Sequence, residues 1–166
     1  MEVQGGRTHS AVLVPLYVDA AGVTHAVFTR RRDDLSRHAG EISFPGGRRE
    51  PGETLLEAAL REAHEEIGLP PGDVDVAGAL KPVGTFVTNY AIYPFVGVIE
   101  PGTPWVPQAR EVAEVLELPL EEMRAAHAER RLVRKGIPFR TDTYEVGDAM
   151  IWGATARIVA DLLRRI

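Results

Sequence analysis

The sequence predicts a single α/β domain in which helices cover both faces of a mixed sheet. Two observations support this class. Apolar, β-branched runs alternate along the chain with separate segments of helical periodicity, which is the pattern of a sheet packed between helices. The chain has 166 residues and no fixed-period repeat, and a domain of this length buries roughly 70% of the surface that its unfolded form exposes. We therefore expect one domain over residues 1–166.

The first half of the chain predicts a hairpin, a sharp turn and a helix, in that order. Residues 10–18 and 24–29 are apolar runs separated by the turn sequence of residues 19–22, as in a hairpin. The Pro-Gly-Gly sequence of residues 45–47 requires a sharply shaped backbone. Residues 54–67 have helical periodicity, and a glycine followed by Pro-Pro-Gly ends the helix.

The second half predicts further strands, a hairpin and two helices. Residues 74–99 return to strand patterning, and residues 115–118 form a short, mostly apolar strand. Residues 120–127 are a short amphipathic helix, residues 131–145 a charged hairpin, and residues 154–165 a terminal helix.

Charge and composition exclude several classes of function. The net charge is −5, from 19 basic and 24 acidic residues, and binding to a nucleic acid backbone needs a basic face, so we expect no nucleic acid partner. The chain has no cysteine, which excludes disulfides and thiolate catalysis. The longest uncharged stretch, residues 82–99, contains two prolines and is better explained by two strands than by a membrane span.

The two ends of the chain bear on where the protein is expected to be located. The N-terminus lacks the basic and apolar regions of a secretory signal, and the C-terminus carries no lipidation signal. We expect a cytoplasmic protein with no membrane partner. A homodimer is compatible with the sequence.

Carboxylates are densest in the predicted helix of residues 54–67. Glu62 and Glu66 are four residues apart and Glu65 lies beside them, so the three side chains can converge on the flank of the apolar stripe. Like charges at this spacing repel each other, and a cation would relieve the repulsion. Oxygen ligands without His or Cys favour Mg²⁺ or Mn²⁺. The alternative is a solvated acidic helix face.

The spacing around these carboxylates resembles the Nudix box. The matching residues are Gly47-x5-Glu53-x7-Arg61-Glu62-Ala63-His64-Glu65-Glu66-Ile67-Gly68-Leu69, and only Ala63 departs slightly, where a larger aliphatic residue is usual. The resemblance implies an α/β/α Nudix sandwich with a mixed sheet. It also implies hydrolysis of a nucleoside diphosphate linked to another group, with a divalent cation as cofactor.

The resemblance assigns roles by position in the box. It implies that the metal ligands are the Gly46 carbonyl, Glu62, Glu65 and Glu66. Glu53 and Arg61 are similar to the family's supporting ion pair and are candidate catalytic residues.

The general base is left open between a box glutamate and a carboxylate from a later loop. Glu65 is the candidate within the box, and Glu111 is the favoured candidate outside it, followed by Glu114. A solvated acid near the start of a helix or strand is the alternative for Glu111 and Glu114.

The segment before the box, residues 28–47, resembles the motif that marks coenzyme A diphosphatases within the Nudix group. The match comprises Thr29, Arg31, Leu35, His38, Gly40 and the Ser43-Phe44-Pro45-Gly46-Gly47 sequence. Arg32 stands where serine is usual and Glu41 where glutamine is common, which bears on substrate specificity. The candidate substrate-binding residues are Arg31, Arg32, Arg37, His38 and Gly47.

Basic side chains in this segment suit phosphate oxygens, because a guanidinium donates paired hydrogen bonds. The alternative is a surface turn in which the arginines neutralise Asp33 and Asp34. His38 fits either a phosphate contact or a hydrogen bond that stabilises the loop. Trp152 and Tyr144 can stack on adenine, and core packing is their alternative role.

The resemblance thus implies a small nucleotide as substrate: coenzyme A or a derivative, cleaved to 3′,5′-ADP and 4′-phosphopantetheine. A broader nucleoside-diphosphate hydrolase, for example one acting on ADP-ribose, is the second reading. A non-hydrolytic sensor that binds a nucleotide is the third, and the intact carboxylates argue against it.

Overall fold

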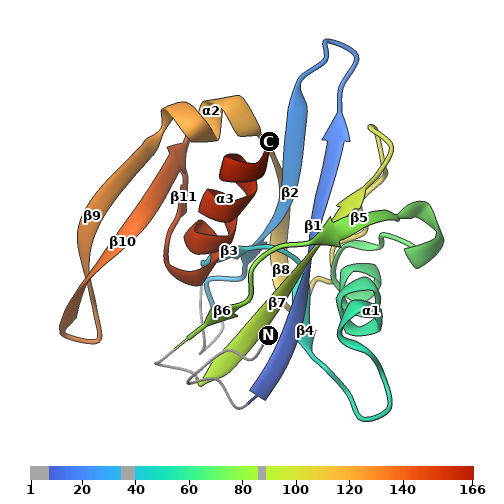
Figure 1. The fold of residues 1–166 in the computed structure, drawn as a ribbon, viewed down its shortest axis with the longest axis horizontal. Coiled ribbons are helices and arrows are strands. Elements are labelled where there is room, and N and C mark those ends of the chain that lie inside the picture. Colours follow the sequence, from blue (N-terminus) through green and yellow to red (C-terminus); the bar gives the residue numbers. More distant parts are fainter. Residues whose placement is uncertain (1–7, 35–39, 86–88) are drawn as a thin grey trace.

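The computed structural model describes residues 8–34, 40–85 and 89–166. A mixed sheet runs through the centre of the molecule, with one helix on one face and two on the other (Figure 1). This arrangement confirms the predicted α/β class.

The strands of the main sheet are β1 (Thr8–Val18), β2 (Thr24–Arg31), β3 (Ile42–Ser43), β4 (Gly46–Arg48), β5 (Asp75–Ala79), β6 (Val83–Gly84), β7 (Tyr90–Val98) and β8 (Val112–Pro119). A second sheet contains β9 (His127–Arg134), β10 (Ile137–Val146) and β11 (Ala149–Ile151). The helices are α1 (Leu55–Ile67), the 3₁₀ turn η1 (Pro71–Asp73), α2 (Leu120–Ala125) and α3 (Gly153–Arg165). No helix in the described ranges is long and apolar enough to cross a membrane.

The strand order of the main sheet, β3-β2-β1-β7-β5, places the segment before α1 at the centre of the fold. β1 pairs in parallel with β7 from Thr8 to Leu16 and antiparallel with β2 at its C-terminal end. β3 pairs with β2, whereas β4 pairs with β1 through the register Val12 to Gly46. The chain therefore crosses from β2 to β1 between β3 and β4, and α1 follows directly.

β1 is apolar on both sides because helices cover both faces of the sheet. Its residues Ala11 and Leu13 pack with Ala59, Ala63 and Ile67 of α1. The residues at the intervening positions of β1, including Val14, face the other side of the sheet and pack with α2, α3 and the second sheet. The uninterrupted apolar pattern of residues 10–18 is thus explained by a strand buried on both faces.

The predicted helix over residues 54–67 is confirmed, with Thr54 as its N-cap. The predicted charged hairpin is shifted, because its strands are β9 and β10 and its turn lies at Lys135 and Gly136. Helix α2 ends at Ala125, two residues earlier than predicted, and β8 is longer than the predicted strand of residues 115–118. These ends are determined by strand pairing, of β8 with β2 and of β9 with β10, and not by amphipathic charge patterning.

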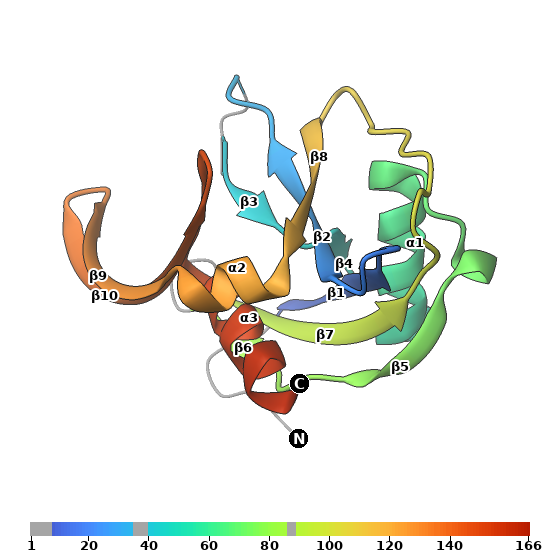
Figure 2. The same cartoon turned by 90° about the horizontal axis from the view of Figure 1, so that it is seen from above.

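The second sheet projects from the body of the molecule. Figure 2 shows the β9–β10 hairpin standing away from the main sheet on the side of β3, with α1 on the opposite side. Its inner end contacts β3 through β11 and packs on α3.

Candidate active site

Helix α1 carries the acidic cluster, and local interactions define both of its ends. The Thr54 hydroxyl accepts a hydrogen bond from the Glu57 amide at 3.1 Å, and the Glu57 carboxylate accepts one from the Thr54 amide at 2.9 Å. This capping box satisfies amides that the first turn leaves free. Gly68 ends the helix at a φ of 73°, a conformation that favours glycine.

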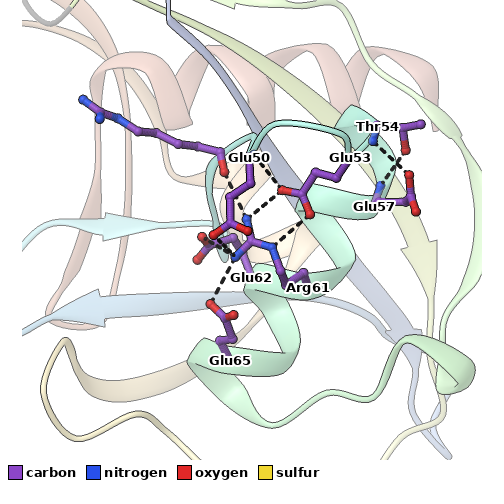
Figure 3. A network of polar contacts seen from close by, with 8 residues as sticks. Glu50, Glu53, Thr54, Glu57, Arg61, Glu62 and Glu65 are labelled. Carbon is purple, nitrogen blue, oxygen red and sulfur yellow. Dashed lines mark hydrogen bonds and ion pairs between the residues drawn. The ribbon is translucent and has the colours of Figure 1, made fainter.

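Arg61 is the centre of the polar network on this helix (Figure 3). Its Nε and Nη2 atoms donate to the two Glu53 carboxylate oxygens at 3.0 and 2.8 Å, and Nη2 also donates to the Arg48 carbonyl at 3.1 Å. Its Nη1 donates to Glu62 at 3.1 Å and to Glu65 at 3.2 Å. The hydrogen bond from Arg61 lowers the pKa of Glu53. The paired geometry expected of Glu53 and Arg61 is present and fixes the loop before α1 to the helix.

Glu66 faces the interior next to β4. Its carboxylate accepts a hydrogen bond from the Gly46 amide at 2.9 Å, and the residue is only 9% exposed. Burial, followed by the negative charge of Glu62, raises the pKa of Glu66 to about 9. Burial also raises the pKa of Glu62. A Cβ atom at Gly47 would lie 2.7 Å from the Glu62 carboxyl, so a side chain at this position would displace that carboxyl.

The expected convergence of three carboxylates is only partly met. Glu62 and Glu66 are hydrogen-bonded neighbours, whereas Glu65 turns to Arg61. Across residues 8–34, 40–85 and 89–166, no three His, Cys, Asp or Glu side chains stand close enough to hold a metal ion in this conformation. The physical reason is that Arg61 supplies the positive charge that draws Glu62 and Glu65 to it.

The donor set nevertheless fits a hard divalent cation. All the donors are oxygen atoms, which Mg²⁺ and Mn²⁺ prefer. Glu66 is a buried carboxyl with a strongly raised pKa, so a nearby cation would stabilise its ionised form. Glu65 is 53% exposed at its side chain and can rotate from Arg61 toward the other two carboxylates.

The loop before β8 brings Glu111 to this cluster. The Val106 amide donates to the Ile67 carbonyl at 2.9 Å, and the Gln108 amide donates to the Glu66 carbonyl at 2.8 Å. The loop thereby occupies carbonyls at the end of α1, and the negative charge of Glu111 contributes to the raised pKa of Glu66. The sequence predicted a role for Glu111 but not the contact of this loop with α1, because the loop binds α1 through backbone amides that no side-chain pattern reveals.

Glu114, the second candidate base outside the box, is engaged elsewhere. Its carboxylate accepts a hydrogen bond from Arg30 Nε at 2.7 Å, and Arg30 also approaches Asp148 at 3.4 Å. Among the described residues, the side chain of Glu111 has no such ion pair. Of the two acids, Glu111 is therefore the better placed to act on a substrate.

The sequence model of the NUDIX domain matches residues 7–136. The chain belongs to the Nudix family. It is a hydrolase that acts on pyrophosphate bonds, with a nucleoside diphosphate-linked compound as substrate, and Nudix enzymes generally use divalent metal ions.

Relatives and solved structures agree with this assignment. The "Uncharacterized Nudix hydrolase NudL" of Citrobacter koseri is 36% identical over 96% of this chain and 83% of its own length. The crystal structure of the Nudix hydrolase RenU of M. smegmatis superposes with a TM-score of 0.62 at 24% identity, over 72% of this chain and 75% of RenU. The NUDIX domain of Shewanella oneidensis NrtR, solved with ADP ribose, has a TM-score of 0.58 at 16% identity, over 72% of this chain and 77% of that one.

Two candidate substrate-binding arginines of this Nudix hydrolase, Arg31 and Arg32, lie at the end of β2. Arg31 ends the strand; its amide donates to the Glu41 carbonyl at 2.9 Å. Arg32 donates through Nε to Asp34 at 2.9 Å and through Nη1 to the Ala109 carbonyl at 2.8 Å. For Arg32, these contacts support the self-neutralised turn. The Arg32 amide also donates to the Glu111 carbonyl at 3.0 Å, so the turn adjoins the carboxylate cluster.

Two further candidates, Arg37 and His38, lie outside the described residues. Tyr144 is 2% exposed within the core, so the core-packing alternative holds for it. Trp152 is half-buried; its ring lies 5.7 Å from that of Phe139, and the Arg134 guanidinium lies 5.2 Å from its centre.

Proposed function

We propose that this Nudix hydrolase is a Mg²⁺- or Mn²⁺-dependent coenzyme A diphosphatase that releases 3′,5′-ADP and 4′-phosphopantetheine. The observation that supports this substrate is the path of the segment resembling the coenzyme A motif. Its described residues include the end of β2, β3 and the start of β4, and they contact the cluster at two places, through Gly46 to Glu66 and through Arg32 to Glu111. A substrate held by this segment has its diphosphate beside the carboxylates.

In this proposal Glu62, Glu65, Glu66 and the Gly46 carbonyl hold the cation. When bound, the cation neutralises charge on the diphosphate and lowers the pKa of the attacking water. Glu65 leaves its hydrogen bond with Arg61 to join these ligands, while Arg61 stays bonded to Glu53. The ion pair of Arg61 with Glu53 holds the Gly46–Gly47 side of the site against α1.

Glu111 accepts a proton from the water that attacks phosphorus. Attack by the water oxygen breaks one P–O bond of the diphosphate bridge. Each product keeps one of the two bridge phosphates, and the 3′-phosphate stays on the adenosine. An exposed carboxylate near the cluster suits this role because its oxygen atoms are open to an attacking water. Glu65 is the alternative base, and in that case it leaves the cation with fewer protein ligands.

Arg31 is proposed to recognise the 3′-phosphate of coenzyme A, with Arg37, His38 and Gly47 as further substrate-binding residues. Arg32 contributes less, since its guanidinium is already bonded to Asp34 and Ala109. We also propose that residues 1–166 form one domain, because the second sheet and α3 share a core with the main sheet.

Hydrolysis of ADP-ribose is the second candidate. The NrtR domain was solved with that compound, and the engagement of Arg32 removes one cation that a 3′-phosphate could use. A sensor function is less consistent with the chain, because every box carboxylate is retained.

The test is a panel of coenzyme A, dephospho-coenzyme A and ADP-ribose with Mg²⁺ or Mn²⁺, the products being identified by mass spectrometry. We expect coenzyme A to give 3′,5′-ADP and 4′-phosphopantetheine. Arg31→Ala should lower kcat/KM for coenzyme A by a factor that corresponds to about 1.5–3 kcal/mol, the contribution of one charge-assisted hydrogen bond. The same variant should affect dephospho-coenzyme A much less. Efficient ADP-ribose hydrolysis without coenzyme A cleavage would replace the proposal by the second candidate.

The base is tested by Glu111→Gln, with Glu114→Gln as the matched control on the same segment. We expect Glu111→Gln to lower kcat at least about a hundredfold, the usual range for a general base, and Glu114→Gln to leave kcat nearly unchanged. The reverse order would reject Glu111 and leave Glu65 as the base.

A further inference from the structure

A pocket lies where α2, α3 and the β9–β10 hairpin meet, on the face of the main sheet opposite α1 (Figure 1). Its volume is about 320 Å³, at the lower end of the range of small-molecule sites. Ala160 and Leu163 form part of its apolar wall. The polar residues that line it are Arg124, His127, Asp142, Tyr144 and Arg164. The proposed function uses none of these residues.

The hydroxyl of Tyr144 is a hydrogen-bonding group that the fold leaves unused. The Tyr144 residue is 2% exposed, and its ring lies 5.2 Å from that of His127. Among the residues that the structure describes, no group forms a hydrogen bond with this hydroxyl. The oxygen is not sealed in the core, because Nε1 of Trp105 is the only such buried side-chain atom without a partner in the described ranges. The hydroxyl therefore opens into the pocket that Tyr144 lines.

Arg124 of α2 presents a fixed positive charge at this pocket. Its Nη1 and Nη2 atoms donate to the carbonyls of Leu163 and Ile166 at 3.1 and 3.4 Å. Its ion pair with Glu121 is long, at 3.5 Å, and the Glu121 side chain is 79% exposed. An exposed pair of this kind contributes little. The guanidinium is thus held in place by the end of α3, with its charge only weakly compensated.

Arg164 of α3 is a second guanidinium at the pocket, and it is free to turn toward a ligand. Its side chain is 70% exposed, and its ion pair with Asp161 is 3.5 Å long. Asp161 has closer donors, the Lys81 amide at 2.9 Å and Arg165 Nε at 3.1 Å. Arg164 can therefore leave Asp161 without depriving that carboxylate of its hydrogen bonds.

Asp142, the one carboxylate among the described lining residues, is already paired. Its Oδ1 atom lies 2.7 Å from Nε2 of His127. Burial, followed by the charge of Asp142, raises the pKa of Tyr144. The charges of Arg164 and Arg124 act on the same hydroxyl in the opposite direction. The charged groups thus surround the Tyr144 hydroxyl, and two guanidiniums against one paired carboxylate make the lining positive.

A phosphate group fits these donors better than a carboxylate does. A guanidinium pairs with either anion, but here donors from α2, α3 and β10 face one pocket. A phosphate monoester has three terminal oxygens and accepts hydrogen bonds from three sides, whereas a carboxylate has two oxygens. The apolar surface of Ala160 and Leu163 suits the organic part of such an ester and offers nothing to free phosphate.

We infer that this pocket binds a small organic phosphate monoester, at a site separate from the carboxylate cluster. The phosphate accepts hydrogen bonds from Arg124, Arg164 and the Tyr144 hydroxyl, and the organic part packs on Leu163. The ligand links α2, α3 and β10, so its binding stabilises the folded protein. The inference does not depend on the proposed function, because no residue of the carboxylate cluster takes part.

The first experiment measures binding of phenyl phosphate by calorimetry in the presence of a chelator, which keeps divalent cations from the carboxylate cluster. We expect saturable binding to the wild type, weakened at least about tenfold in Arg164→Gln by loss of a charge-assisted hydrogen bond. The matched control is Arg157→Gln, since Arg157 lies on the same helix, donates to the Gly84 carbonyl at 3.0 Å and does not line the pocket. Absence of binding to the wild type, or equal weakening in both variants, would overturn the inference.

Tyr144→Phe removes one oxygen atom and keeps the ring in the core. We expect it to weaken phenyl phosphate binding about threefold to tenfold, the range for one hydrogen bond. Its Tm without ligand should equal that of the wild type, because the hydroxyl bonds to none of the described residues. Unchanged affinity in this variant would overturn the inference, because the ligand would not reach the hydroxyl.

Two further probes and one further variant identify the ligand class and the place of binding. Benzoate and inorganic phosphate should both bind more weakly than phenyl phosphate. Benzoate binding of equal strength would indicate a carboxylate site, and inorganic phosphate binding of equal strength would indicate a site for the free anion; either result overturns the inference. Loss of binding in Arg31→Ala would place the probe on the proposed substrate loop and also overturn it. Failure of the wild type to cleave coenzyme A would bear on the proposed function alone.

Discussion

Replacing Glu66 with Gln should stabilise the metal-free protein at alkaline pH. The Glu66 carboxyl is 9% exposed and next to Glu62, and these surroundings raise its pKa from 4.5 to about 9. Between these values the folded protein binds a proton that the unfolded chain releases. The free energy of unfolding therefore falls as pH rises from about 4.5 to about 9. Glutamine removes the ionisation and keeps an oxygen that can accept the hydrogen bond from Gly46.

The size of this stabilisation follows from the difference between the pKa of Glu66 in the unfolded and folded states. Each pKa unit corresponds to about 1.4 kcal/mol, so a window from 4.5 to about 9 sets an upper bound of about 6 kcal/mol above pH 9. Glutamine still places a polar amide in a buried position, which offsets part of the gain. We expect Glu66→Gln to gain about 2 kcal/mol near pH 9, or about 4–8 °C in Tm for a domain of this size.

The assay is thermal unfolding with a chelator at several pH values between about 5 and 9. Glu100→Gln is the matched control, because Glu100 is exposed whereas Glu66 is buried. The wild type and the control should lose stability over this range, and Glu66→Gln should lose less. Added Mg²⁺ should raise the Tm of the wild type and the control by mass action and have little effect on Glu66→Gln.

Activity completes the test. Glu66→Gln, and likewise Glu62→Gln, should remove most of the hydrolysis while the fold remains intact. Parallel pH–stability curves for the wild type and Glu66→Gln would refute the electrostatic reasoning. Near wild-type turnover of both variants at saturating Mg²⁺ would refute the metal assignment.

Three further predictions concern the neighbours of the cluster. Arg61→Ala should abolish most activity and lower stability, because it leaves Glu53 and Glu62 without their partner; unfolding and kinetic measurements on the same preparation check this, and a variant as stable as the wild type would contradict it. Gly47→Ala should lower kcat at least tenfold with the fold retained in circular dichroism, since the added Cβ would lie 2.7 Å from the Glu62 carboxyl; unchanged kcat would show that Glu62 moves without consequence. Thr54→Ala should cost about 1 kcal/mol through loss of the N-cap, measured by urea unfolding, with kcat unaffected; a fall in kcat as large as that of Gly47→Ala would imply that the cap also positions the cluster.

Local patterns in the sequence were sufficient to predict helix α1 and the residues that it presents. The cap at Thr54, the stop at Gly68 and the four-residue spacing of Glu62 and Glu66 are all encoded within one short segment. Each depends on interactions between residues near in sequence, which is why they can be read without a structure. The pairing of Glu53 with Arg61, which the resemblance to the Nudix box implied, is present in the structure.

Sequence by itself thus determined the family, the α/β class and the acidic helix, whereas only the tertiary structure decided how the charges on that helix are distributed. Arg61 holds Glu65 apart from the other carboxylates, and a backbone bond from Gln108 to the end of α1 brings Glu111 to Glu66. The tertiary structure also decided that the Arg32 side chain is bonded to Asp34 and Ala109. These contacts depend on burial and on backbone groups, which every residue carries alike, so side-chain patterns could not reveal them.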